Sequence, residues 1–404
     1  MKTDSSIIQT RVLIVGAGPA GLGISLALKR AGVVDQLVVD ARKVGAAFRA
    51  WPKTMSLLTP SFFSNAFGLT DLNSNDPDSS PADYLHTQHP KGEGYANYLE
   101  AVVAHFQLPV RTGLEVTAVK KTTAGFVVES SQGTIYADYV IWAAGQFFYP
   151  RDQDFPGSHH ALHSSKVRDW TQLEGEQFTV IGGYESGVDA ALNLVNNGKS
   201  VRLVSRGEPW ASDHPDPSRS LSPRTFDRLR ELLATPEKAQ RLEFMKDTTI
   251  SSIEAGEGFW ILRDQDGIPI SATTRPILAN GFHSGLGIVS ELFEHNKHGN
   301  PIFTEEADES TLVSGLFYSG PALVHRNALF CFIYKFRARF GVIAAEIAHR
   351  LGKPDVDEKL ISYAKAGFMN TDLDCCTTCE CAIDSDESDD SDTPEPASFE
   401  KQTS

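Results

Sequence analysis

The sequence of 404 residues predicts an α/β protein built from two units in which strands alternate with helices. One observation is a glycine-rich turn that occurs twice, first at Gly16 and again at Gly182. Each turn follows an apolar strand and opens an apolar helix. A second observation is a hairpin followed by a buried strand that ends in glycine, at residues 125–145 and again at 258–281. Both units therefore have the plan of a three-layer, Rossmann-type dinucleotide-binding domain.

The first turn reads Gly-Ala-Gly-Pro-Ala-Gly over residues 16–21, and each glycine has a separate task. Gly16 makes the tight turn, Gly18 lets a pyrophosphate approach the backbone, and Gly21 lets helix and strand pack closely. The helix that follows directs its positive N-terminal end at the phosphates. Asp40 ends the next strand, 19 positions after Gly21, where an acid hydrogen-bonds a ribose hydroxyl. These residues predict a dinucleotide site.

The second turn carries Tyr184 in place of the middle glycine. This change leaves three interpretations open: the dinucleotide lies further out, the ring lies over it, or the unit binds nicotinamide poorly. Where the first unit has Asp40, the second has Arg206, and arginine there favours the 2′-phosphate of NADPH over NADH. A surface arginine at a strand end is the alternative. The residues expected to bind this second nucleotide are Gly182, Gly183, Ser186, Gly187 and Arg206.

The chain carries a net charge of −15, and residues 371–404 contribute most of it, with eleven acids and one lysine. The remaining body is only weakly acidic, and nothing in it indicates binding of nucleic acid. No apolar run is long enough to span a membrane, and the apolar start is the first strand and helix rather than a signal peptide. The five cysteines do not form a secreted disulfide framework, so we expect a cytoplasmic protein.

The order of these elements predicts that the second unit is inserted into a discontinuous first one. The first domain takes residues 1–150 and 282–370, and the second takes 151–281. Residues 371–404 are too acidic and polar to build a core, so we expect a disordered tail. A polar stretch over residues 71–94 is expected to form a long loop that caps a site.

Over residues 10–350 the chain resembles the two-dinucleotide flavoprotein group that contains the flavin-containing monooxygenases and the thioredoxin-reductase-like enzymes. In that group the first turn holds FAD and the second holds NADPH, so the resemblance implies both cofactors. Residues 44–51 look like the monooxygenases' segment that runs along the flavin, although only one of its two glycines is kept, as Gly45.

Two further segments extend the resemblance. Gly320-Pro321 precedes a long helix expected at about residues 327–350, and it looks like the segment that brings a helix N-terminus to the flavin. Val116 and Val119 fall where the group lines the adenine, and two valines in the core of a strand are the alternative. The residues assigned to FAD are Gly16, Gly18, Gly21, Asp40, Gly45, Phe48, Arg49, Val119, Ala144, Gly145, Gly320 and Pro321.

The monooxygenases also carry a linker motif of the form Phe-x-Gly, three residues, His, three residues, aromatic. Phe155 and Gly157 match it, but Ala161 stands at the histidine position. Either His163 with Trp170 fills the role in a shifted register, or the segment is a histidine-rich surface linker.

The resemblance implies an FAD-dependent, NADPH-using oxidoreductase, and our first hypothesis is a flavin monooxygenase. NADPH reduces FAD, molecular oxygen adds at the flavin C4a, and the peroxyflavin passes one oxygen atom to a small-molecule substrate. This chemistry requires no acid or base residue, so the catalytic residues stay unassigned. Arg49, His86 and His89 are the candidates beside the flavin edge.

The second hypothesis is a flavin-dependent disulfide or metal-ion reductase. Bacillithiol-disulfide-reductase-like proteins carry a cysteine in the first turn, where this chain has Ala20, and no cysteine precedes Cys331, which we expect buried in a helix. A C-terminal thiol cluster remains, either as a soft-metal site or thiol relay or as an unselected part of the tail: Cys375, Cys376, Cys379 and Cys381. A third hypothesis is an FAD-binding redox sensor in which Tyr184 weakens turnover.

Overall fold

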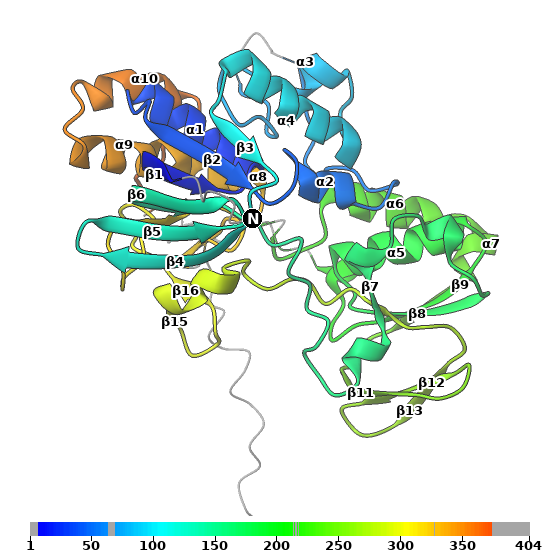
Figure 1. Cartoon of the computed structure of the whole chain (residues 1–404). Helices are drawn as coiled ribbons and strands as arrows, with labels where there is room; N and C mark the ends of the chain where they lie inside the picture. The colour runs from blue at the N-terminus through cyan, green and yellow to red at the C-terminus, as the bar shows by residue number, and fades with distance from the viewer. Residues whose placement is uncertain are drawn as a thin grey trace, which may run out of the picture.

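The computed structural model describes residues 7–63, 69–212, 214, 216, 218–326 and 328–373. Figure 1 shows two lobes side by side, each with its own sheet and helices. Each lobe also has its own apolar core, because separate clusters of buried side chains fill the first lobe and the two layers of the second. In the part of the chain that the structure describes, no helix is long and apolar enough to cross a membrane.

The first lobe is built on a sheet that has seven strands within the described residues. The strands lie in the order β3-β2-β1-β6-β5-β4, and β17 also pairs with β6. β1, β2, β3, β6 and β17 form the parallel part, whereas β4 and β5 join as an antiparallel meander. Their bounds are β1 (Ile8–Val15), β2 (Gln36–Asp40), β3 (Val110–Thr112), β4 (Val116–Thr122), β5 (Gly125–Ser130), β6 (Gly133–Trp142) and β17 (Leu316–Tyr318).

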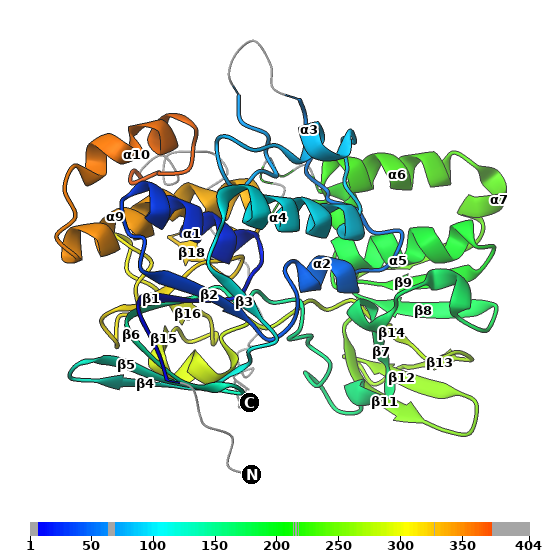
Figure 2. The ribbon, with the colours of Figure 1, turned by 45° about the horizontal axis from the view of Figure 1, so that its top comes forward.

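Helices cover this sheet, as Figure 2 shows for α1, α4, α9 and α10. α1 begins at Pro19, whose fixed φ suits a first helical position, and it buries Leu22, Ile24 and neighbouring small residues. α1 packs closely on α9, where a Cβ at Gly23 would lie 2.0 Å from the Phe340 ring. The helices are α1 (Pro19–Arg30), α2 (Ala46–Ala50), α3 (Pro81–Leu85), α4 (Gly92–Phe106), α8 (Ile333–Phe336), α9 (Phe340–Arg350) and α10 (Val356–Lys365).

The second lobe has three layers. A parallel sheet in the order β10-β9-β8-β14-β7 lies between helices and a three-stranded antiparallel sheet, β11-β12-β13 (Figure 1). Its helices are α5 (Glu185–Asn196), α6 (Pro223–Leu233) and α7 (Pro236–Ala239). The strands are β7 (Leu162–His163), β8 (Gln177–Ile181), β9 (Ser200–Val204), β10 (Leu242–Met245), β11 (Ile250–Ala255), β12 (Trp260–Asp264), β13 (Pro269–Ala272) and β14 (Ile277–Leu278).

Two short antiparallel pairs complete the first lobe: β15 (Glu294–His295) with β16 (Pro301–Ile302), and β18 (Val324–His325) with β19 (Ala328–Leu329). The predicted fold class is confirmed, because two α/β units are present and the strands of the second fall between β6 and β17 of the first. The domain boundaries at residues 150, 281 and 370 stay predictions. The predicted tail, apart from residues 371–373, lies outside the described residues.

Two expectations about elements are wrong. The helix expected from about residue 327 begins at Ile333, because β18 and β19 pair as a hairpin and the backbone of Phe332 is still extended. The stretch over 71–94 is not one long loop, because α3 and the start of α4 lie within it. Its first part is buried, since residues 71 and 73–76 are each at most 4% exposed.

Candidate functional site

The three glycines of the first turn differ in what surrounds them. At Gly16, with φ of +117°, an added Cβ would lie 2.2 Å from the Ala143 carbonyl oxygen. At Gly21 it would lie 1.9 Å from the Gly16 carbonyl oxygen, so both positions require glycine for packing. At Gly18 an added Cβ would meet nothing within 4 Å. The turn therefore holds its shape through Gly16 and Gly21 and presents open space at Gly18, where a phosphate can approach the backbone.

Asp40 is held against the same turn. Its Oδ2 accepts a hydrogen bond from the Ala17 backbone N–H at 2.8 Å, and its Oδ1 accepts one from the Arg42 N–H at 2.7 Å. The carboxylate is only half-buried, and each of its oxygens has a second lone pair for a ribose hydroxyl. Gly45, in the left-handed region with φ of 65°, donates its N–H to the Ala17 carbonyl oxygen. This bond joins the start of α2 to the first glycine turn.

Orphaned polar atoms beside this turn support a bound dinucleotide. Asn75 donates weakly to the Pro19 carbonyl at 3.5 Å, but its buried Oδ1 has no partner among the described residues. The buried Ser319 hydroxyl, one position before Gly320, likewise has no partner in the described part of the chain. Buried polar atoms are rarely left unpaired, so the Asn75 amide oxygen fits a hydroxyl of FAD and the Ser319 hydroxyl fits a hydroxyl or a phosphate.

The remaining FAD assignments lie at the same sheet edge or in the core behind it. Ala144 and Gly145 follow β6, and Gly320 and Pro321 follow β17, so two neighbouring parallel strands end side by side. Val119 on β4 is buried in the core opposite Val128, and Phe48 is buried against Trp51 and Tyr95. We retain these positions as predictions for the FAD site.

Arg49, His86 and His89 are placed apart from one another. Arg49 forms ion pairs with Glu93 and with Glu100, the latter at 2.8 Å, and so fastens α2 to α4. His86 is exposed at the C-terminal end of α3. His89 lies 2.9 Å through Nδ1 from the Leu57 carbonyl oxygen, and burial lowers the pKa of its imidazole. These contacts give Arg49 and His89 structural roles, and a catalytic role for any of the three stays untested.

The second turn repeats the geometry of the first at its two outer glycines. A Cβ at Gly182 would lie 2.5 Å from the Ala279 carbonyl oxygen, and one at Gly187 would lie 1.7 Å from the Gly182 carbonyl oxygen. Gly183 packs on Trp210, since a Cβ there would come within 2.9 Å of the indole. Ser186 is half-buried in the first turn of α5.

Tyr184 is fixed by a neighbouring loop. It is the N-cap residue of α5, and its hydroxyl donates to the Ser220 carbonyl oxygen at 2.6 Å. The hydroxyl is therefore tied to the segment that leads into α6. Arg206, at the end of β9, is exposed and has no hydrogen bond or ion pair to any described residue, so it is available to a phosphate.

The sequence did not reveal a polar contact between the lobes. Lys335 Nζ lies 2.6 Å from Asp216 Oδ1 and 2.7 Å from Ser218 Oγ, and the Cys331 thiol donates to Ser218 Oγ at 3.1 Å. Cys331 is exposed and precedes α8, so its predicted burial within a helix is wrong, because the backbone turns helical only at Ile333. No sequence signal marks these pairs, since more than 100 positions separate the partners.

His163 lies where the two connections between the lobes meet. It is 1% exposed, and its Nε2 is 3.0 Å from the Gly281 carbonyl oxygen, while Nδ1 is 2.8 Å from Ser165 Oγ. Its ring packs edge-on against Phe282, and burial lowers the pKa of the imidazole. Trp170 is buried in the second core. This placement favours the shifted register over a surface linker at His163.

A match to a protein-family model identifies the family of this chain. The family described as pyridine nucleotide-disulphide oxidoreductase matches residues 13–320. The chain belongs to this family. It is therefore an enzyme, an FAD-dependent oxidoreductase that uses NADP(H), which favours the two enzymatic hypotheses over the sensor.

Three relatives are similar over most of this chain. The bacilliredoxin reductase Bdr of Bacillus subtilis is 28% identical over 348 residues, which are 85% of this chain and 99% of that protein. The bacillithiol disulfide reductase Bdr (YpdA) of Staphylococcus aureus matches with a TM-score of 0.68 and 20% identity, over 85% of this chain and 99% of that one. A flavin monooxygenase from Stenotrophomonas maltophilia matches with a TM-score of 0.68 and 16% identity, over the same shares.

The described part of this oxidoreductase holds no group of three or more His, Cys, Asp or Glu side chains that would bind a metal ion. The four cysteines predicted as a metal or thiol cluster, Cys375, Cys376, Cys379 and Cys381, lie outside the described residues.

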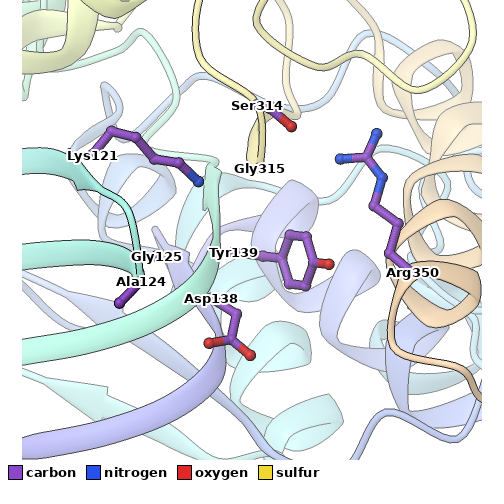
Figure 3. Close-up of a pocket in the computed structure, with 8 residues that line it drawn as sticks. All are labelled: Lys121, Ala124, Gly125, Asp138, Tyr139, Ser314, Gly315 and Arg350. Carbon is purple, nitrogen blue, oxygen red and sulfur yellow. The ribbon is translucent and has the colours of Figure 1, made fainter.

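One cavity of about 380 Å³ has no residue of either glycine turn in its lining (Figure 3). Asp138 and Tyr139 line it from the middle of β6, whereas the FAD edge follows Trp142. Lys121 and Arg350 reach in from opposite sides of the Tyr139 ring. Because Arg350 is already bonded to Glu309 and Glu346, its charge is satisfied within the protein, and we assign this cavity no role.

Proposed function

We propose that the protein is a reductase that uses NADPH and FAD to cleave a small or protein disulfide. The overall reaction consumes one NADPH, one proton and one disulfide, and it yields NADP⁺ and two thiols. The main support is that the similarity to the bacilliredoxin reductase of Bacillus subtilis covers almost the whole of that protein.

Within the structure, Cys331 is the residue that supports this proposal. It is the one free cysteine in the described ranges, it is exposed, and it lies between the lobes that hold the two glycine turns. Although Cys331 is exposed by its accessible surface, partial desolvation of its thiol by the surrounding protein raises the pKa of Cys331, while the hydrogen bond to Ser218 and the nearby Lys335 ammonium oppose that rise. An exposed thiol at this junction would be available to a substrate that binds between the lobes.

In this mechanism the chain binds both nucleotides and supplies the thiolate. Gly18 and the N-terminus of α1 receive the FAD pyrophosphate, Asp40 receives a ribose hydroxyl, and Arg206 receives the 2′-phosphate of NADPH. The flavin, when bound, carries two electrons from NADPH to sulfur. The Cys331 thiolate attacks one substrate sulfur and releases the first thiol. Reduction of the mixed disulfide by two electrons, with uptake of one proton, would regenerate the Cys331 thiolate and release the second thiol.

Monooxygenation is the second candidate. The first turn carries Ala20 rather than a thiol, and the raised pKa of Cys331 keeps its sulfur protonated at neutral pH. Both observations disfavour rapid disulfide exchange, because the thiolate is the nucleophile. In this reading the small-molecule substrate takes one atom of molecular oxygen, and no thiol takes part.

One experiment separates the two candidates. The FAD-loaded enzyme is reduced anaerobically with NADPH while the flavin absorbance is followed, and then either a model disulfide or oxygen is added. Reoxidation by the disulfide with release of two thiols supports the reductase. A transient flavin–oxygen species with no reoxidation by disulfides supports the monooxygenase, and a flavin that stays oxidised with NADPH contradicts both.

For the reductase, replacing Cys331 by serine is expected to reduce disulfide turnover at least 100-fold while NADPH still bleaches the flavin. The matched control replaces Cys375, Cys376, Cys379 and Cys381 together by serine and leaves Cys331 in place. Because the pKa of Cys331 is raised, disulfide turnover is expected to increase as the pH rises above neutral. If the control loses activity and Cys331→Ser does not, the reacting thiol belongs to the C-terminal cluster rather than to Cys331.

A further inference from the structure

Two antiparallel connections join the lobes. The first leads from β6 to the second lobe and the second returns after β14, and they meet where Pro150 forms a bridge with Phe282. The His283 N–H donates to the Tyr149 carbonyl at 2.8 Å, and the Arg151 N–H donates to the Gly281 carbonyl at 3.1 Å. Any rotation of one lobe against the other has to bend this two-stranded ribbon.

A cavity of about 510 Å³ opens beside the ribbon, within the range of small-molecule sites. The ribbon lines one side of it, through Tyr149, Arg151 and His283. The first lobe lines the other, through Ser290 and through the β15–β16 hairpin with His295 and Asn300. None of these residues is among the positions assigned to FAD and NADPH, although the cavity adjoins the FAD edge, because the backbone of Gly285 packs against the Gly145 carbonyl.

The polar side chains that line this cavity can each donate a hydrogen bond, and no carboxylate is among them. The carboxylate of Asp154 stands 3.9 Å from both the Arg151 guanidinium and the His283 imidazole, which is too far for a hydrogen bond to either. His295 Nε2 lies 3.2 Å from Ser290 Oγ, so these two groups hold each other in place. The guanidinium and both imidazoles therefore retain hydrogen-bonding capacity for an external acceptor.

We propose that this cavity binds a small organic anion with two or more carboxylate or phosphate groups. One anionic group accepts hydrogen bonds from Arg151 and His283 on the ribbon, and another accepts them from His295 and Asn300 on the hairpin. Charge-assisted hydrogen bonds of this kind are the strongest that a protein offers to an anion. A ligand bound to both sides ties the ribbon to the first lobe and so restrains the rotation of the second lobe.

The test uses the full-length FAD-loaded enzyme and two probes, citrate and inorganic phosphate, in calorimetric titrations. We expect saturable binding of citrate with one site per chain, and binding of phosphate that is at least tenfold weaker because it reaches one side only. Arg151→Gln and His283→Gln should each weaken citrate binding about 10-fold or more, since each removes a charge-assisted or direct hydrogen bond. Phosphate binding as tight as citrate binding would contradict the two-sided site.

Two control variants localise the binding. His298→Gln changes an exposed imidazole of the same hairpin that does not line the cavity, and citrate affinity should stay within twofold of that of the parent enzyme. Arg206→Ala removes the candidate phosphate contact of the nicotinamide site and should likewise leave citrate binding intact. Loss of citrate binding in Arg206→Ala would place the anion at the nucleotide site and overturn the proposal.

Amide hydrogen exchange gives a readout that does not depend on activity. Citrate should slow exchange at residues 145–157 and 279–302, which cover the ribbon and the hairpin. Arg151→Lys should restore part of the affinity that Arg151→Gln loses, which distinguishes a lost contact from a misfolded variant. No saturable binding of citrate, equal affinity in the parent and in Arg151→Gln, or protection confined to the glycine turns would each overturn the proposal.

Discussion

Adding a single methyl group is expected to affect stability at one glycine of the first turn and FAD binding at another. The backbone at Gly21 has no room for a Cβ, whereas the space at Gly18 is open and its φ of −92° suits any residue. We therefore expect Gly21→Ala to lower the free energy of unfolding by about 1–3 kcal/mol through overpacking. Gly18→Ala should leave stability nearly unchanged and weaken FAD binding. Urea unfolding of the apoprotein and fluorescence titration with FAD measure the two effects, and equal loss of stability would contradict the assignment.

Arg206 carries the predicted preference for NADPH. Because no described residue pairs with it, Arg206→Ala should cost little stability and should raise the Michaelis constant for NADPH about 10-fold or more, the loss expected for a charged hydrogen bond. The constant for NADH should change less than twofold, because NADH has no 2′-phosphate. Steady-state kinetics with both nucleotides decide, and equal changes would refute a role at the 2′-phosphate.

At this scale the sequence predicts what is local and misses what is distant. The tasks of Gly16, Gly18 and Gly21 follow from their spacing, since the strand, turn and helix that they join are continuous in the chain. The contact of Lys335 with Asp216 is not predictable in this way, because it depends on how two lobes are placed.

At the scale of elements, the least expected feature is the set of hydrogen bonds that Arg337, which follows α8, makes with the buried segment 71–76. Polar composition predicts a long loop there, but the structure buries its first part and pairs its backbone. Arg337 donates to the carbonyls of Asp71 and Ser74 and to the Ser74 hydroxyl, and Tyr95 donates to the Asn73 carbonyl at 2.7 Å. Burial lowers the pKa of Arg337 to about 10, so the side chain is still charged at neutral pH.

Replacing Arg337 by methionine should therefore destabilise the first lobe strongly. The variant keeps apolar contact with Phe368 but leaves buried carbonyls without donors, at a cost of about 3 kcal/mol. Arg230→Met is the control, since Arg230 is exposed on α6 and stacks on Phe226, and it should cost less than about 0.5 kcal/mol. Chemical denaturation measures both variants, and similar losses would show that the buried hydrogen bonds of Arg337 contribute nothing specific.

At the scale of the whole molecule, polar contacts hold the lobes together at more than one point. Besides Lys335 with Asp216, Lys53 after α2 lies 2.9 Å from Asp169, and Arg224 of α6 donates to Ser56 at 3.1 Å. The repeat of turn, helix and hairpin was enough to predict two α/β units. It contained no information on these contacts, because each joins side chains from different units.

The Lys335–Asp216 pair makes part of the stability dependent on pH. Burial alone would raise the pKa of Asp216, but hydrogen bonds from Lys335 and Ser218 outweigh it and hold that pKa below its ordinary value of 3.8. A lowered folded pKa stabilises the protein above that ordinary value, and the contribution disappears as the pH falls through the folded value. The melting temperature of Lys335→Met should therefore fall less steeply between pH 5 and pH 3 than that of the parent. An equal fall of the melting temperature with pH in the variant and the parent would contradict the prediction.

The position of β17 has a consequence for synthesis on the ribosome. β17 pairs with Val140–Trp142 of β6, yet the whole second lobe is translated between these two strands. The second lobe has its own core and can fold while part of β6 still has an open edge. Unpaired edges of nascent sheets promote association with other chains. The protein thus has an unpaired sheet edge in the interval between release of β14 and arrival of β17, when a ribosome-bound chaperone would protect it from association with other chains.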